Sequence, residues 1–296
     1  MEPVGGVDGD ARSGLAEPRA DGRDLVAVRG PDGDPVRGDR YGGIDVWVNN
    51  AMVSVFAPAW EVTAPEFRRV TEVNYLGTVY GTLAALRHMR VHGRGAIVQV
   101  GSALAYRGIP LQSAYCASKH AIQGFNDSLR AELLHEYPGV TLSMVQLPAI
   151  NTPQFSWVRT RLPRHPQPVP PIFAPEVAAR AILWAADHGR RELNVGGPTW
   201  KARLGDILAP GLLDRKLARD GYDSQQTGTE IDPAAWRDNL DRPGDDDADR
   251  GAEGVFTDRA RRTSAALWVG THKPAVSGVA LTALALAVTA LGRRRR

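Results

Sequence analysis

The stretch of sequence that decides the fold runs from residue 95 to residue 147 and reads GAIVQV GSALAYRGIP LQSAYCASKH AIQGFNDSLR AELLHEYPGV TLSMVQL. The apolar run at 95–100 predicts a buried strand, and a second one follows at 140–147. Between them, apolar residues recur at helical spacing until a Pro-Gly pair ends the helix. These residues are Ala121, Ile122, Phe125, Leu129 and Leu133. A strand, a helix and a strand in this order predict parallel strands.

The same alternation extends outward on both sides. Residues 44–48 predict another buried strand, and Thr63 with Glu66 forms a capping-box pattern that opens a helix to about Arg90. After a Pro-rich loop at 153–175, residues 176–187 predict a helix and 191–195 a last strand. We therefore expect a Rossmann-like, doubly wound parallel α/β sheet over residues 44–220.

The flanking segments differ in composition. Residues 1–43 are dominated by Gly, Asp, Arg and Pro, and only Leu25-Val26-Ala27-Val28 reads as a short strand, so we expect an irregular segment. Residues 221–274 are mostly polar and predict a solvated linker. Its acidic cluster at 245–247 offers no fixed coordination geometry, so no metal site is expected.

The C-terminal segment contains 18 uncharged residues, 275–292, followed by four arginines. As a helix this run is roughly 27 Å long, close to the ~30 Å hydrocarbon core of a bilayer. A docked core helix is the alternative, but the basic flanks favour a transmembrane anchor at 275–296. We expect a membrane-associated protein with its catalytic domain facing the cytoplasm, where a chain with one cysteine fits. The net charge of +3 is smaller than the terminal arginine run alone, so we expect no nucleic-acid partner.

A Tyr-Lys pair marks the candidate chemistry. Tyr115 and Lys119 are four residues apart at the start of a predicted helix, which places both side chains on one face. A nearby ammonium favours the phenolate and lowers the pKa of the tyrosine toward a range useful for acid/base catalysis. Ser102 follows the strand at 95–100, at the sheet edge where ligands of open α/β sheets bind. Asn74 is a polar amide in an otherwise apolar helix segment and could hold a water in a proton relay.

In order and spacing these motifs resemble the short-chain dehydrogenase/reductase family from about residue 44 to 200. The matching residues are Asn49-Asn50-Ala51, Asn74, Ser102, Tyr115-x-x-x-Lys119 and Pro148-Ala149-x-x-Thr152.

The resemblance implies a role for each residue. Tyr115 is the catalytic acid/base, and Lys119 lowers its pKa and holds the nicotinamide ribose. Ser102 orients and polarises the substrate carbonyl, and Asn74 supports a water relay. The remaining residues bind the cofactor: Asn49, Asn50 and Ala51 line the adenosine side, and Pro148 and Thr152 contact the nicotinamide.

Each residue also has a simpler interpretation. Asn49-Asn50 could be a strand-end turn, Asn74 a satisfied core amide, Ser102 a helix cap and Thr152 a cap after a strand. Cys116 fits a small helix residue better than a nucleophile, because no partner His is evident. Joint occurrence of all motifs in this order favours the functional interpretation.

The sequence departs from the family at three places. Met52 and Ala149 stand where the family usually has Gly. More seriously, no TGxxxGxG turn precedes residue 44, although the family uses one to receive the pyrophosphate at a helix N-terminus. We therefore expect an N-terminally incomplete sheet with an unpaired apolar edge at 44–48, and a wrongly started or frame-shifted segment at 1–43.

The resemblance implies an NAD- or NADP-dependent oxidoreductase, with NADP favoured, that interconverts an alcohol and a ketone or aldehyde. The alternative is a truncated or degenerate relative that binds no dinucleotide and is non-catalytic. A stand-alone membrane-binding module would explain only the C-terminal segment. The long helices predicted at 64–90 and 115–136 occupy the positions that build a dimer interface in the family. The resemblance therefore allows a homodimer or a homotetramer.

Overall fold

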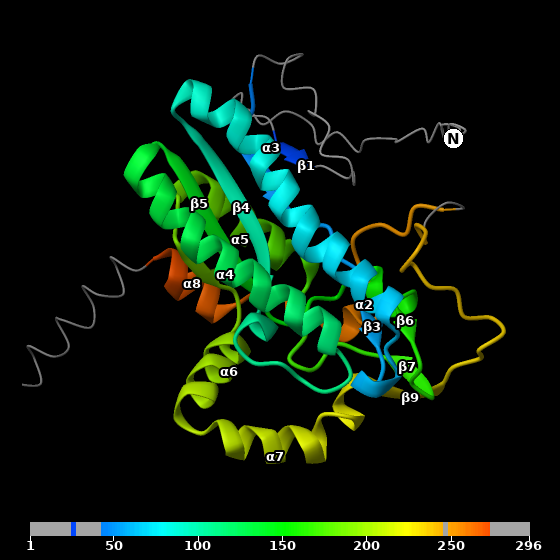
Figure 1. Cartoon of the computed structure of the whole chain (residues 1–296). Coiled ribbons are helices and arrows are strands. Elements are labelled where there is room, and N and C mark those ends of the chain that lie inside the picture. The colour runs from blue at the N-terminus through cyan, green and yellow to red at the C-terminus, as the bar shows by residue number, and fades with distance from the viewer. Residues whose placement is uncertain (1–24, 28–42, 245–247, 273–296) are drawn as a thin grey trace, which may run out of the picture.

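A five-stranded parallel sheet forms the centre of the molecule in the computed structural model, which describes residues 25–27, 43–244 and 248–272 (Figure 1). Every neighbouring pair of strands is parallel. The predicted Rossmann-like α/β fold is therefore confirmed. In spatial order the strands are β1 (Leu25–Ala27), β2 (Val46–Asn49), β4 (Gly95–Ser102), β5 (Val140–Leu147) and β8 (Glu192–Asn194).

Helices cover both faces of this sheet. Successive strand residues point to opposite sides, and apolar residues on both sides need a covering layer. Val98 and Val145 belong to the apolar cluster that packs against α5. Trp47, Ile97 and Leu142 belong to the cluster on the opposite face, under α3 and α4. Figure 1 shows α3 and α4 side by side in front of the sheet with α5 behind it. The helices are α3 (Gly77–His92), α4 (Ser113–Glu136) and α5 (Pro175–His188).

The predicted capping box is present at the start of α2 (Ala64–Thr71). The Thr63 hydroxyl accepts from the Glu66 N–H, and the Glu66 carboxylate accepts from the Thr63 N–H at 2.9 Å. The helix does not continue regularly to Arg90 as predicted, because a π-helical turn, η2 (Glu72–Leu76), separates α2 from α3. Such turns insert a residue into a helix and occur frequently at functional sites.

The edge of β2 is paired, so the predicted exposed edge at 44–48 is wrong. Leu25 lies opposite Val46 and Ala27 opposite Val48 in the parallel ladder. The backbone of β1 thus covers N–H and C=O groups that an edge strand would expose. The rest of the predicted irregular segment, with the glycine-rich turn sought there, lies outside the described residues.

Parts of the stretch 221–274, predicted as a solvated linker, pack against the sheet domain, although most of its described residues are exposed or half-buried. Strand β9 (Gln226–Glu230) pairs antiparallel with β7 (Arg164–Pro166). Leu240, Phe256 and Leu267 are each buried in a different apolar cluster. These three apolar side chains therefore attach a stretch whose average composition is polar.

Two helices, α6 (Gly197–Leu208) and α7 (Pro210–Asp220), follow β8. In Figure 1, α6 descends at the lower left and α7 runs across the bottom of the view, and this pair, joined at a bend, is the α6–α7 hairpin. Among the described residues no helix combines the length and apolar character needed to cross a membrane. The predicted anchor at 275–296 lies outside them, as does the acidic cluster at 245–247. The other elements are β3 (Val55–Phe56), η1 (Ala59–Glu61), η3 (Ala103–Ala105), η4 (Pro153–Ser156), β6 (Arg159–Thr160), η5 (Asp223–Gln225), η6 (Thr257–Arg259) and α8 (Ala265–Thr271).

Candidate active site

Tyr115 and Lys119 lie one turn apart near the start of α4, as the spacing predicts. The Lys119 ammonium donates to the carbonyl oxygen of Val100 at 2.8 Å and lies 5.6 Å from the centroid of the Tyr115 ring. Lys119 is only 4% exposed. A lysine buried beside the carboxyl end of β4 is therefore held in place by the strand that carries Ser102.

Ser102 is the last residue of β4 and faces Tyr115. A hydrogen bond with Ser102 lowers the pKa of Tyr115, although burial outweighs it. The Ser102 hydroxyl also accepts from the Leu104 N–H at 3.1 Å and caps η3. The capping interpretation and the contact with Tyr115 therefore both hold for the same hydroxyl.

The electrostatics of the pair differ from the simple prediction. Burial raises the pKa of Tyr115 to about 12, and burial lowers the pKa of Lys119 to about 8. Lys119 is not among the groups that lower the pKa of Tyr115 in this geometry. Its ammonium points to the Val100 carbonyl, and both groups lose solvation, which disfavours both charged forms. In this arrangement, desolvation outweighs any attraction between phenolate and ammonium.

Asn74 is fully buried in the π-helical turn. Its side-chain oxygen accepts from the Val53 N–H at 2.8 Å, and its amide nitrogen donates to the Val53 carbonyl at 2.9 Å and to the Ser118 hydroxyl at 3.1 Å. The side chain therefore connects the segment after β2 with α4, one residue from Lys119. This geometry fits the core-amide alternative, and the water relay stays a prediction.

Asn49 also makes hydrogen bonds within the fold. Its amide nitrogen donates to Gln99 at 2.8 Å and to Thr82 at 3.0 Å, and its oxygen accepts from the Trp47 indole at 2.9 Å. A side chain at Gly81 would clash with that oxygen, so the glycine permits α3 to approach β2 closely.

The other residues expected at the cofactor lie at the same edge of the sheet. Asn50 and Ala51 are exposed directly after β2, whereas Pro148 and Thr152 are half-buried after β5. Gly196, just past β8, packs so closely on the Pro148 ring that a Cβ would clash, and Gly254 approaches the Thr152 carbonyl in the same way. The structure thus places all the predicted site residues at or near the carboxyl ends of β2, β4 and β5.

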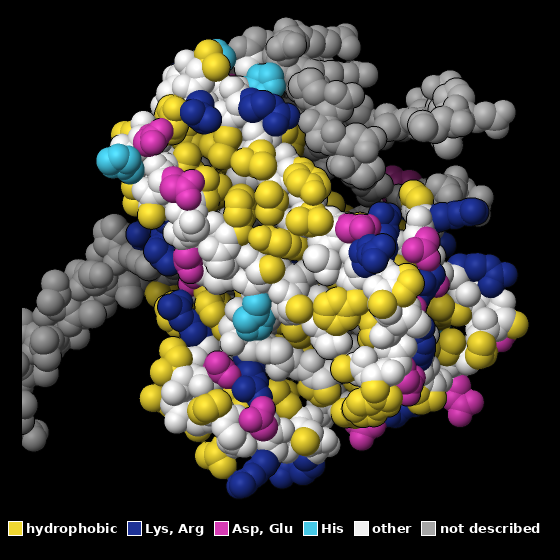
Figure 2. Space-filling model, in the orientation of Figure 1, with side chains coloured by type: hydrophobic (Ala, Val, Ile, Leu, Met, Phe, Trp, Pro, Cys, Tyr) yellow, Lys and Arg dark blue, Asp and Glu magenta, His cyan; other side chains and the backbone are white. Residues whose placement is uncertain are grey.

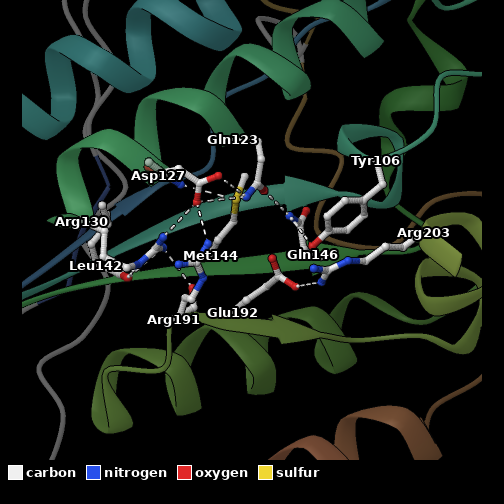
Figure 3. A network of polar contacts seen from close by, with 11 residues as sticks. Tyr106, Gln123, Asp127, Arg130, Leu142, Met144, Gln146, Arg191, Glu192 and Arg203 are labelled. Carbon is white, nitrogen blue, oxygen red and sulfur yellow. Dashed lines mark hydrogen bonds and ion pairs between the residues drawn. The ribbon is translucent and has the colours of Figure 1, made fainter. Parts of the chain in front are cut away.

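Sequence reasoning missed a polar network on the neighbouring part of the sheet, drawn in Figure 3. Gln146 on β5 donates to the Tyr106 hydroxyl at 3.2 Å and to Gln123 on α4 at 2.9 Å. Burial, followed by a hydrogen bond with Glu192, raises the pKa of Tyr106. Arg203 pairs with Glu192 at 3.0 Å and lies 5.0 Å over the Tyr106 ring. The network connects the segment between Ser102 and Tyr115 to β5, β8 and α6.

A signal for this network was present in the sequence. Gln99 interrupts the apolar run of β4, and Gln146 lies between Val145 and Leu147 on β5; both glutamines are completely buried. Buried amides need hydrogen-bond partners, so such residues predict polar side chains on the covering helix.

These residues suit proton transfer to or from an oxygen atom, because a protonated hydroxyl, a second hydroxyl and a buried amine converge. They fit the nicotinamide half of a dinucleotide: Lys119 and Tyr115 can hold a ribose hydroxyl, and Pro148 and Thr152 border the same edge. The family receives the pyrophosphate on a TGxxxGxG turn, and the sequence before residue 44 contains no such motif. Within the described ranges, no group of three or more His, Cys, Asp or Glu side chains is placed to hold a metal ion.

Comparison with known proteins agrees with this geometry. Residues 37–162 match the family model described as short chain dehydrogenase. An uncharacterized oxidoreductase, YxnA of Bacillus subtilis (strain 168), is 35% identical over 195 residues, 65% of this chain and 55% of that protein. Human dehydrogenase/reductase SDR family member 7 is 42% identical over 105 residues, 36% of this chain and 31% of that protein. The chain therefore spans about half, or less, of the length of these curated relatives.

Two solved structures resemble the fold. A short-chain dehydrogenase from Streptomyces avermitilis has a TM-score of 0.53 at 25% identity, over 69% of this chain and 81% of that one. A short chain dehydrogenase from Burkholderia cenocepacia J2315, solved in complex with NADP, has a TM-score of 0.51 at 28% identity, over 61% of this chain and 71% of that one.

Proposed function

Because the chain belongs to the short-chain dehydrogenase/reductase family, we propose that it is an NAD(P)-dependent oxidoreductase that interconverts an alcohol and a ketone or aldehyde. The observation that carries the proposal is the convergence of Ser102, Tyr115 and buried Lys119 at the carboxyl ends of β4 and β5. This is the sheet edge at which open α/β folds bind ligands.

In the proposed reaction Tyr115 moves the proton. When a carbonyl is reduced, the Tyr115 hydroxyl donates its proton to the carbonyl oxygen, and the Ser102 hydroxyl hydrogen-bonds the same oxygen. A nicotinamide held at this site would supply or accept the hydride. Burial raises the pKa of Tyr115 to about 12, so its hydroxyl is protonated near neutral pH, the state needed to donate a proton to a carbonyl oxygen.

The cofactor proposal is NAD or NADP, with NADP favoured. It is supported by the Burkholderia relative, whose structure holds NADP. Lys119 and Tyr115 would hold the nicotinamide ribose, Pro148 and Thr152 would border the nicotinamide, and the segment 49–51 would line the adenosine side.

The test compares the full chain with Tyr115→Phe. We expect turnover of carbonyl substrates with NADPH to fall about a thousandfold, because a positioned acid/base contributes roughly 10²–10⁴ in rate. Circular dichroism and thermal melting should be unchanged. Tyr80→Phe, at an exposed position on α3, is the matched control and should keep full activity. Retained turnover in Tyr115→Phe would contradict the assigned role.

The alternative, a non-catalytic relative, is tested by fluorescence titration of the full chain with NADPH and NADH. Saturable binding by the folded chain supports the enzyme, whereas a folded chain that binds neither nucleotide supports the alternative. Membrane association through 275–296 with a cytoplasm-facing catalytic domain, and assembly into a homodimer or homotetramer, remain proposals. Exposed Leu83 and Val91 on α3 support the assembly proposal.

A further inference from the structure

The hairpin of α6 and α7 exposes an apolar stripe. Within it only Thr199 is buried, since α7 has no buried residue. Large apolar side chains at helical spacing instead face solvent, and Figure 2 shows hydrophobic side chains gathered over α6. Their exposed fractions are 52% for Trp200, 57% for Leu204, 68% for Ile207, 71% for Leu208 and 66% for Leu212 on α7.

Polar contacts fix the opposite side of the hairpin to the body of the protein. Arg107, between Ser102 and Tyr115, pairs with Asp206 on α6 at 2.8 Å and also with Asp214 on α7. Arg203 pairs with Glu192 on β8. The Arg107 side chain is only 17% exposed, so these contacts hold α6 and α7 in one orientation. Helix α6 therefore presents its paired polar residues inward and its large apolar residues outward, the reverse of an ordinary surface helix, and α7 contributes exposed Leu212.

The charges on the hairpin are suited to an anionic surface. Its acidic residues are engaged internally, because Asp206 and Asp214 pair with Arg107, and Asp220 pairs with Lys216 and Arg219. Exposed Lys201 and Arg215 add positive charge beside the apolar stripe. Helices with Trp and Leu on one side and basic residues on the other bind at the lipid headgroup boundary.

The last described helix, α8, lies beside the strand that leads into this hairpin. Helix α8 packs on β8, the strand that leads into α6, and Gly270 lies against Leu193 of that strand. Trp268 on α8 is 57% exposed. The described part ends at residue 272, and the sequence then enters the uncharged run at 275–292 with its four terminal arginines. A run of this composition is suited to a bilayer rather than to an aqueous surface.

From these observations we propose that the α6–α7 hairpin lies on an anionic lipid bilayer, with the stripe from Trp200 to Leu212 inserted at the headgroup boundary. The competing occupants are a second copy of the chain and the chain's own segment 275–292. The test must therefore report on the stripe itself and not only on membrane attachment.

The experiment labels single positions of the full chain with an environment-sensitive NBD fluorophore. Ile207→Cys places it in the stripe, and Leu134→Cys on α4, 69% exposed, is the matched control. Native Cys116 is 6% exposed, and labelling of the unsubstituted chain measures its background. Each protein is mixed with phosphatidylcholine vesicles, with and without phosphatidylglycerol. We expect a blue shift and quenching by doxyl-labelled lipids at 207 but not at 134, stronger with phosphatidylglycerol.

A second measurement uses Ile207→Gln, which should lower the partition coefficient on phosphatidylglycerol vesicles about tenfold, because a buried Ile contributes about that factor or more. Leu134→Gln should leave it unchanged. If the protein co-sediments with vesicles but the NBD emission at position 207 does not change, the proposal is overturned. It is also overturned if the protein does not bind vesicles. A blue shift without lipid would overturn it in favour of a second copy if it depended on protein concentration, or in favour of segment 275–292 if it did not.

Discussion

Lys119 should make the stability of the protein depend on pH in a particular direction. Its pKa is lowered from 10.5 to about 8 in the fold. Between these two values the unfolded chain binds more protons than the folded one, so the free energy of unfolding rises with pH. A shift of about 2.5 pKa units corresponds to about 3 kcal/mol, of which about 2 kcal/mol should be gained between about pH 7 and about pH 9.5.

Replacing Lys119 by Met removes this gain. Above pH 9, ionisation of Tyr115 and Cys116 lowers the free energy of unfolding in both proteins. Burial raises the pKa of each group, so each ionises in the unfolded chain before it ionises in the fold. The informative quantity is therefore the difference between the two proteins. Wild type should gain about 2 kcal/mol relative to Lys119→Met across this range.

Urea denaturation of both full-length proteins at several pH values measures this difference. Lys201→Met, at an exposed position on α6, is the matched control and should show no change with pH relative to wild type. Parallel stability curves for wild type and Lys119→Met would refute the buried-ammonium reasoning. Lys119→Met should also lose turnover under conditions where urea denaturation shows that it is folded. The loss then reflects the catalytic role of Lys119 and not unfolding.

Three further predictions concern the supports of the site. Arg107→Met should leave two carboxylates without their cation and increase hydrogen exchange in α6 and α7 by a local destabilisation of about 1–2 kcal/mol; unchanged exchange would show that other contacts hold the hairpin. Asn151→Ala should lower the free energy of unfolding by about 2–3 kcal/mol because it leaves the buried Phe256 N–H unpaired, whereas exposed Asn50→Ala should be neutral; equal effects in urea melts would contradict this. Gly81→Ala should force α3 away from β2 and lower the melting temperature, and a stabilised variant would show that the contact relaxes freely.

The sequence predicts the middle of the chain well because apolar periodicity there is strong. The strand predicted at 140–147 coincides with β5, and the capping box at Thr63 is present. Tyr115, Lys119 and Ser102 converge because the end of β4 and the start of α4 meet at one sheet edge. Local apolar periodicity predicts the structure correctly here because consecutive elements of the chain build this part of the core.

Other features depend on contacts that periodicity does not encode. The π-helical turn at Glu72–Leu76 adds one residue to a helix without changing its composition. The pKa of Tyr115 depends on burial, which outweighs the charge placed four residues away. Leu240 is a single apolar residue in a polar stretch, so the linker prediction failed there.

The packing of the C-terminal stretch affects how this chain must fold. Arg69 donates to the carbonyl of Leu240, 171 residues later, and Asn151 accepts from Phe256, 105 residues later. Contacts of such large sequence separation form slowly, because the chain loses the entropy of closing a long loop before the contact contributes any favourable energy. During synthesis the apolar clusters that receive Leu240, Phe256 and Leu267 stay open until those residues leave the ribosome. The nascent chain therefore exposes hydrophobic surface until late in translation. Such surface promotes aggregation, and chaperones protect chains in this state.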